Sequence, residues 1–177
     1  AASTEIVDLG QPLGQLHGVY ILAQNKQGLV IVDTHAAHER IGYEALKAAY
    51  ADQGVAQQRL LIALTCVVTP ETAEYISSHS GLLAQLGFDL SIDEQGQCRI
   101  MAIPSLLKNA EAVVLVEKVL AELQIHQHSA HIQESLHKIF ATMACHRAVR
   151  APQQLSMKEM EELLRQIEKT PASAYCN

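Results

Sequence analysis

Residues 33 to 44 read Asp33-Thr34-His35-Ala36-Ala37-His38-Glu39-Arg40-Ile41-Gly42-Tyr43-Glu44, and an apolar run at positions 29 to 32 leads directly into them. Such a run favours a buried strand that ends at a site. His35 and Glu39 stand four positions apart, so they share one face if the segment is helical. With Asp33 at the helix start, imidazole nitrogen and carboxylate oxygen become available together, a donor set that divalent metals accept. The stretch therefore predicts a strand, a helix and a candidate metal site at their junction.

Composition limits the classes of protein to which the chain can belong. Its 177 residues are 49% hydrophobic, enough for one compact core or two small lobes. A net charge of −6 and a pI near 5.8 argue against a domain that holds nucleic acid by its own field. No apolar run approaches the roughly 20 residues that cross a bilayer, and no phosphate-binding glycine loop is present. We therefore expect no membrane contact and no nucleotide cofactor in this domain.

Four cysteines are spread along the chain without a C-x-x-C pair. The N-terminus has no basic segment followed by an apolar one, as a secretory signal would. A reducing cytoplasm is the expected setting.

The first third of the chain predicts an antiparallel hairpin followed by a helix. Alternation favours a strand from Gln15 to Gln24, a turn at 25–28 and a second strand from Leu29 to Asp33. A helix from about His35 to Tyr50 follows. A branched apolar run from Leu60 to Thr69 predicts a buried strand. The expected buried stripe of the helix is Ala37, Ile41, Ala45 and Ala48.

The remaining elements follow from turn and capping signals. Ser156 and Glu159 form a capping box, which predicts a helix from Met157 to Lys169. Thr69-Pro70 has the form of a helix cap with proline at the first position. The other expected elements are a helix from Pro70 to about Gly87, a hairpin of 88–92 with 98–103, and helices at 111–124 and 132–150.

Several ordered motifs resemble the C-terminal domain of the MutL family of DNA mismatch-repair proteins, over essentially the whole chain. In the endonuclease-bearing members this domain dimerises and nicks duplex DNA with bound metal, so the resemblance implies a homodimer acting on DNA. The motifs are D-x-H-A-x2-E-x4-E from Asp33 to Glu44, the run Ala144-Cys145-His146-Arg147-Ala148-Val149-Arg150-Ala151, the Gln11–Gln15 lead-in, the Leu155–Met160 helix start and the Cys176 tail.

The resemblance also implies roles for individual residues. It implies that Asp33 and Glu39 are catalytic groups. Thiolate and imidazole suit Zn²⁺, structural or regulatory, and the carboxylates suit Mn²⁺ or Mg²⁺ for nicking. The implied metal ligands are Asp33, His35, Glu39, Cys145 and Cys176. The residues expected to support the site or contact DNA phosphates are Arg40, Glu44, Arg147 and Arg150.

The chain departs from the family pattern at two places. Thr34 stands where the family commonly has Gln, a change outside the ligands that we expect to be tolerated. After Cys176 the family continues into His-Gly-Arg-Pro, whose His is a ligand, whereas this sequence ends at Asn177. We therefore expect nicking by this piece alone to be impaired.

A segment at 58–63, Gln58-Arg59-Leu60-Leu61-Ile62-Ala63, is similar to the motif through which these domains dock on the replicative sliding clamp, with Ala63 in place of a common Pro. The implied partners are this clamp, the mismatch-recognition protein MutS and an N-terminal ATPase region. The same apolar run also fits an ordinary core strand, so both interpretations stay open. The expected clamp contacts are Gln58, Leu60, Leu61 and Ile62.

The sequence thus predicts a two-lobed α/β (α+β) domain with antiparallel hairpins and packed helices. Residues 1–65 and 132–177 form the lobe expected to carry the dimer surface and the metal site, and residues 66–131 form an inserted, regulatory lobe. The leading function is metal-dependent DNA nicking by a homodimer. The alternative is a dimerisation and clamp-binding module with a structural zinc and no activity of its own. An unrelated metallohydrolase is disfavoured, because His35-x-x-His38-Glu39 matches no zinc-peptidase order.

Overall fold

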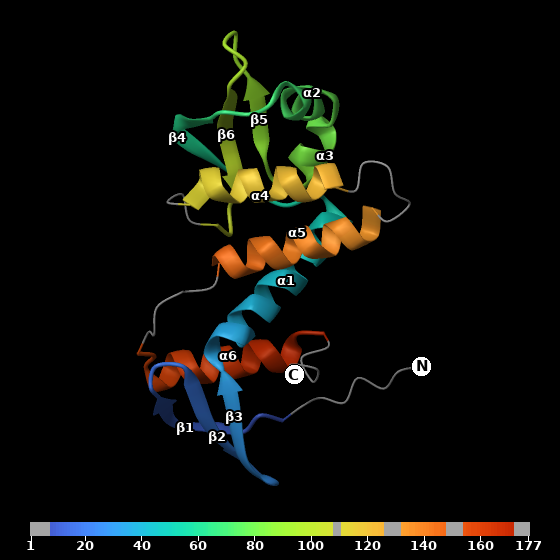
Figure 1. Ribbon diagram of the computed structural model, residues 1–177. Coiled ribbons are helices and arrows are strands. Elements are labelled where there is room, and N and C mark those ends of the chain that lie inside the picture. The colour runs from blue at the N-terminus through green and yellow to red at the C-terminus, as the bar shows by residue number, and fades with distance from the viewer. Residues whose placement is uncertain (1–7, 108–110, 126–131, 148–153, 172–177) are drawn as a thin grey trace. The chain divides into compact units, whose positions relative to one another are not determined.

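The computed structural model describes residues 8–107, 111–125, 132–147 and 154–171. It shows an α+β fold with two three-stranded antiparallel sheets (Figure 1). The predicted fold class is confirmed. No helix within these ranges is long and apolar enough to cross a membrane. The elements in chain order are β1 (Gln11–Leu16), β2 (Tyr20–Asn25), β3 (Gly28–Asp33), α1 (Thr34–Asp52), β4 (Gln57–Cys66), α2 (Pro70–Ser78), α3 (Ser80–Gln85), β5 (Asp89–Ile92), β6 (Cys98–Pro104), α4 (Ala112–Ile125), α5 (Ile132–Arg147) and α6 (Met157–Lys169).

Contacts group the chain into two compact units, residues 1–44 with 148–177 and residues 45–147. Helix α1 begins in the first unit and ends in the second. The sequence predicts that residues 132–147, which form α5, belong to the first lobe, whereas α5 groups with the middle unit because it packs on α4. The functional division into a dimerising lobe and a regulatory lobe stays a prediction.

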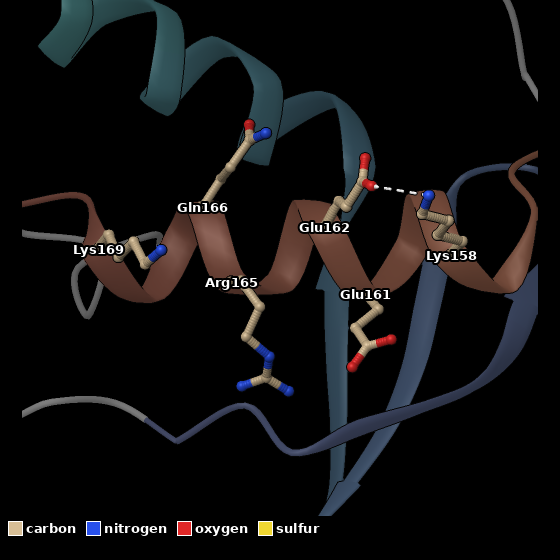
Figure 2. A pocket seen from close by; sticks show the side chains of 6 residues that line it. All are labelled: Lys158, Glu161, Glu162, Arg165, Gln166 and Lys169. Atoms are coloured by element: carbon tan, nitrogen blue, oxygen red, sulfur yellow. Dashed lines mark ion pairs between the residues drawn. The ribbon is translucent and has the colours of Figure 1, made fainter.

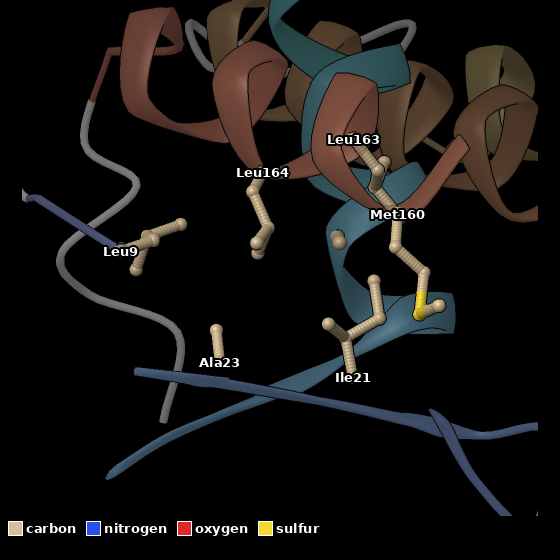
Figure 3. Close-up of a cluster of buried hydrophobic side chains, with 7 residues drawn as sticks. Leu9, Ile21, Ala23, Met160, Leu163 and Leu164 are labelled. Carbon is tan, nitrogen blue, oxygen red and sulfur yellow. The ribbon is translucent and has the colours of Figure 1, made fainter. Parts of the chain in front are cut away.

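The first unit is a sheet in the order β1-β2-β3 with α6 packed on one face. Ile21 and Ala23 point from β2 toward α6, and both are fully buried (Figure 3). Burying each large aliphatic side chain of this kind stabilises the fold by about 1.5–3 kcal/mol. The buried residues of this core are Leu9, Ile21, Ala23, Ala37, Met160, Leu163 and Leu164.

A tight turn interrupts the single strand that the sequence predicts from Gln15 to Gln24. His17 has φ +53° and Gly18 has φ +70°, and the Val19 N–H donates to the Leu16 carbonyl at 3.0 Å. Two consecutive left-handed residues define the type I′ turn that suits a right-twisted hairpin. The single-strand prediction is therefore wrong, because the chain folds back there and β1 pairs with β2.

Helix α1 is confirmed, but its predicted buried stripe holds only at the N-terminal end. Ala37 is buried and Ile41 is half-buried in the core of the first unit. Ala45 and Ala48 are exposed, and Leu46 is fully buried in their place. Leucine has far more apolar surface than alanine, so burying Leu46 gains more free energy.

The second unit is a sheet in the order β4-β6-β5, with α2 and α3 packed on β5 and α4 packed on β4 and α5. The predicted cap is present, since the Thr69 side chain accepts a hydrogen bond from the Thr72 N–H and Pro70 opens α2. The predicted single helix to Gly87 is divided at His79, whose backbone leaves the helical region, into α2 and α3.

Strand β4 is not the buried strand that its apolar composition predicts. Leu61 and Ile62 are 105% and 81% exposed. The ladder with β6 is regular at residues 57–59 and again at 64–66, and the residues between are out of register. β4 is an edge strand, where such an irregularity disrupts few ladder hydrogen bonds. The prediction of burial is therefore wrong for Leu61 and Ile62.

Candidate functional site

The candidate site lies where β3 ends and α1 begins. Asp33 is the last residue of β3, and its Oδ1 accepts hydrogen bonds from the backbone N–H groups of His35 at 2.8 Å and Ala36 at 3.0 Å. These N–H groups have no partner within the helix, so Asp33 caps α1. The positive end of the helix also favours a charged carboxylate at this position. Asp33 is thus held in place by the helix that carries the other candidate ligands.

His35 and Glu39 lie one turn apart on α1, and their side chains meet. His35 Nε2 and Glu39 Oε1 are 3.2 Å apart, and both side chains are partly exposed. Two ligand atoms about 2.0–2.1 Å from a tetrahedral ion are roughly 3.3 Å from each other. The observed separation therefore suits an ion pair and also suits shared coordination of one cation. The prediction that His35 and Glu39 share one face of a helix is confirmed.

Thr34 and His38 fix the helix start without facing the candidate ligands. The Thr34 N–H and hydroxyl both donate to the Val19 carbonyl, at 2.9 and 2.8 Å. Thr34 is buried, so its hydroxyl ties α1 to the β1–β2 turn. His38 Nδ1 lies 2.6 Å from the Thr34 carbonyl, an acceptor that requires a proton on that nitrogen. His38 is therefore engaged with the backbone.

Arg40 and Glu44 form the next pair along α1. Arg40 Nη2 lies 3.0 Å from Glu44 Oε1 and 3.4 Å from the carbonyl oxygen of Pro171, to which it donates. The guanidinium also lies 5.7 Å from the centre of the Tyr43 ring. Burial raises the pKa of the Tyr43 hydroxyl, Glu44 raises it further and Arg40 opposes the increase. That Arg40 and Glu44 support the metal site or contact DNA phosphates stays a prediction.

The other predicted site residues belong elsewhere in the chain. Cys145 is exposed on α5 in the second unit, and Arg147 is the last residue of that helix. Arg150 and Cys176 lie outside the described residues. Across the described ranges, no three His, Cys, Asp or Glu side chains are grouped so that they could hold a metal ion. The convergence of Cys145 and Cys176 with Glu39 therefore stays a prediction.

Sequence reasoning missed a polar cluster beside Cys145. His146 Nδ1 lies 2.8 Å from Glu111 Oε2, and the Lys118 ammonium lies 3.4 Å from Nε2 of the same ring. The His146 side chain is almost fully buried. His146 is part of the Ala144–Ala151 run, but the run does not reveal its partners, because they lie on or next to another helix. The cluster joins the end of α5 to the start of α4.

The outer side of α6 carries charged side chains around an open hollow of about 380 Å³ (Figure 2). Arg165 forms two 2.6 Å contacts with Glu168 and also donates to the Gly10 carbonyl, while Glu168 accepts from the Leu9 N–H at 2.8 Å. These contacts hold the segment before β1 against α6. None of the predicted site residues lines this hollow. Its lining residues are Lys158, Glu161, Glu162, Arg165, Gln166 and Lys169.

Comparison with known proteins gives a consistent result. Residues 13–155 match the protein family described as "MutL C terminal dimerisation domain". The chain is 43% identical over its full length to the DNA mismatch repair protein MutL of Xylella fastidiosa (strain 9a5c). It is 45% identical to that of Thiobacillus denitrificans and 46% identical to that of Pseudomonas paraeruginosa, over 99% of the chain in each case. The chain spans 28–29% of the length of these relatives.

Proposed function

Since this chain belongs to the family of MutL C-terminal dimerisation domains, we propose that it pairs with a second copy of itself through the outer face of the β1-β2-β3 sheet. In the register of β2 and β3, Ile21 and Val32 share the face that packs on α6. Leu22 and Ile31 therefore share the opposite face. That opposite face is the outer face of the sheet.

Among the described residues, nothing covers the outer sheet face, and its exposed side chains are apolar. Leu29 and Ile31 are 63% and 61% exposed, and three further large apolar side chains of β1 and β2 accompany them. A contiguous apolar surface of this kind is a mark of an interaction site. A second copy of the chain is the occupant that the family description supports. The exposed members are Leu13, Leu16, Tyr20, Leu29 and Ile31.

We further propose that the paired domain nicks duplex DNA with a divalent ion held at the start of α1. The observation that supports this is the pair of His35 and Glu39, whose nitrogen and oxygen donors lie 3.2 Å apart on the first turns of α1, with Asp33 directly before the helix. A bound Zn²⁺, Mn²⁺ or Mg²⁺ would activate water and neutralise charge on the phosphoryl oxygens. Asp33 is fixed by its own helix N–H groups, so it would enter such a site already oriented.

The supporting thiols are Cys145 and Cys176, as the family resemblance implies. Thiolates suit Zn²⁺ and carboxylates suit Mn²⁺ or Mg²⁺, so this donor set allows a structural zinc beside a catalytic ion. The alternative function is a dimerisation and clamp-binding module with a structural zinc alone. The exposed Leu61 and Ile62 of β4 support the clamp-binding part of this alternative.

A plasmid assay separates the two functions. The chain is extended by the His-Gly-Arg-Pro continuation and incubated with supercoiled plasmid and Mn²⁺, beside Asp33→Asn, Glu39→Ala and the control Glu161→Gln on the outer side of α6. Nicking by the parent and by Glu161→Gln, with a loss of at least about 100-fold in the two site variants, supports the nuclease. Equal activity in all four proteins would remove Asp33 and Glu39 from the chemistry.

We expect partner proteins to hold the domain at DNA. Its net charge of −6 predicts weak affinity for duplex DNA on its own. Leu61 and Ile62 are presented to solvent on the edge strand β4, as a docking motif for the sliding clamp requires. Tethering by the clamp, by MutS and by an N-terminal ATPase region would raise the effective concentration of the site at DNA.

A further inference from the structure

Two cysteines that the proposed function does not use face each other in the second sheet. Cys66 is the last residue of β4 and Cys98 is the first residue of β6, and they are direct register partners. Opposed residues in an antiparallel ladder have Cα atoms about 4.5–5.5 Å apart, within the roughly 4.4–6.8 Å that a disulfide spans. Both thiols are free and buried. The register therefore brings the two Cα atoms within the range that a disulfide spans.

We propose that Cys66 and Cys98 form a dithiol that closes to a disulfide when the protein meets a small-molecule disulfide such as glutathione disulfide. The thiolate of Cys66 attacks one sulfur of the oxidant, and one glutathione thiolate leaves and takes up a proton. Cys98 then loses its proton and attacks the Cys66 sulfur of the mixed disulfide, releasing the second glutathione. The protein is oxidised by two electrons, and one glutathione disulfide is reduced to two thiols.

The different burial of the two thiols indicates which cysteine reacts first. Cys98 is fully buried, whereas Cys66 retains 7% exposure at the end of an edge strand and is followed by the exposed Val67. Burial raises the pKa of the Cys98 thiol to about 12. Burial also raises the pKa of the Cys66 thiol. The neighbouring Cys98 side chain lowers this pKa, and the Glu117 carboxylate raises it. Cys66 is thus the first nucleophile and Cys98 the resolving one.

The same burial makes the closure slow compared with modification of the exposed Cys145. Once closed, the bond ties the edge strand β4 to the central strand β6. It also closes a loop that contains α2, α3 and β5. A cross-link over a loop of this size restricts the unfolded chain, so the Tm should rise by roughly 5–10 °C.

Oxidation followed by peptide mapping tests the proposal. The reduced 177-residue chain is treated with glutathione disulfide, any residual thiols are alkylated, and the protein is digested without reductant for mass spectrometry. We expect a peptide pair linking Cys66 to Cys98 and a raised Tm. Cys145→Ser is the matched control and should give the same pair. Cys98→Ser should stop at a mixed disulfide on Cys66 and show no such rise in Tm.

Two results would overturn the inference. One is that the oxidised chain contains no Cys66–Cys98 peptide pair while Cys145 is modified. The other is that the linked protein has a Tm equal to or below that of the reduced protein, which would mean that closure distorts the sheet. Because the peptide map is made on the unsubstituted chain, it decides the question even if Cys98→Ser does not fold.

Discussion

One hydroxyl holds the start of α1 against the first sheet. Thr34 Oγ1 donates to the Val19 carbonyl at 2.8 Å, in a buried setting. Thr34→Val keeps the shape but leaves that oxygen one donor short, so it should lower the free energy of unfolding by about 1 kcal/mol. Thr34→Ser keeps the hydroxyl and is the matched control. Urea unfolding of the three proteins checks the difference, and a Thr34→Val protein as stable as its parent would contradict it.

A single carboxylate gives the start of α6 a pH dependence. The backbone and side chain of Ser156 donate to Glu159, which lowers the pKa of this carboxyl from its ordinary range. A lowered folded pKa means that the stabilisation is complete above the unfolded pKa and is lost as pH falls through the folded pKa. Glu159→Gln should therefore be less stable than the parent near neutral pH, with the gap closing as the pH falls through the lowered pKa of Glu159. Thermal unfolding from pH 7 to pH 3 measures this, and a constant gap would contradict it.

At the scale of elements, local signals were predictable. The capping box at Ser156 and Glu159 and the Thr69-Pro70 cap bond residues within three positions of each other, so the sequence contains both partners of each interaction. The turn at His17 was missed because a non-glycine residue with φ +53° has no strong sequence signal. Leu61 and Ile62 were predicted to be buried because composition cannot show that a strand lies at an edge.

In the candidate site too, contacts within one helix turn were predictable from the sequence, and contacts between helices were not. His35 and Glu39 were predictable because one helix turn fixes their separation. The partners of His146 were not, since Glu111 precedes α4 and Lys118 lies on it, and only the packing of α4 with α5 brings them together. The predicted convergence of Cys145 and Cys176 on the α1 carboxylates would also depend on how distant segments pack. It is inferred from the family resemblance alone.

Substitutions in the irregular part of β4 should weaken docking on the clamp without lowering the stability of the fold. Leu61 and Ile62 are exposed, so replacing both with Ala should change the free energy of unfolding by no more than about 0.5 kcal/mol. The same double change should weaken binding to the sliding clamp by at least about tenfold, because it removes the apolar anchors. Fluorescence anisotropy with labelled clamp checks binding, and urea unfolding checks stability.

Ile100 provides the matched control for this element. It is fully buried on β6, opposite Leu64 of β4, so Ile100→Ala should cost about 2–5 kcal/mol of stability. Clamp affinity measured under conditions where this variant stays folded should be unchanged. Unchanged clamp binding by the Leu61→Ala, Ile62→Ala protein would assign its exposed side chains to another role.

At the scale of the whole molecule, the proposed homodimer depends on one face of one sheet. The inner face of β1-β2-β3 is covered by α6, whereas the outer face exposes Leu29 and Ile31 beside apolar side chains of β1 and β2. A soluble single chain rarely leaves such a surface uncovered. A symmetric dimer buries the same patch on both copies, so each substitution acts twice on the interface.

Leu29→Lys with Ile31→Lys should therefore convert the dimer to a monomer. Two added charges per copy would be desolvated in the interface and would face like charges on the partner, which should weaken association at least about 1,000-fold. Glu161→Lys with Glu162→Lys, on the outer side of α6, changes the charge at least as much without touching the sheet and should stay dimeric. Sedimentation velocity over a range of protein concentrations measures both. Because the two lysines sit at exposed strand positions, circular dichroism should remain that of the folded parent; a folded dimer of the sheet variant would move the interface away from this face.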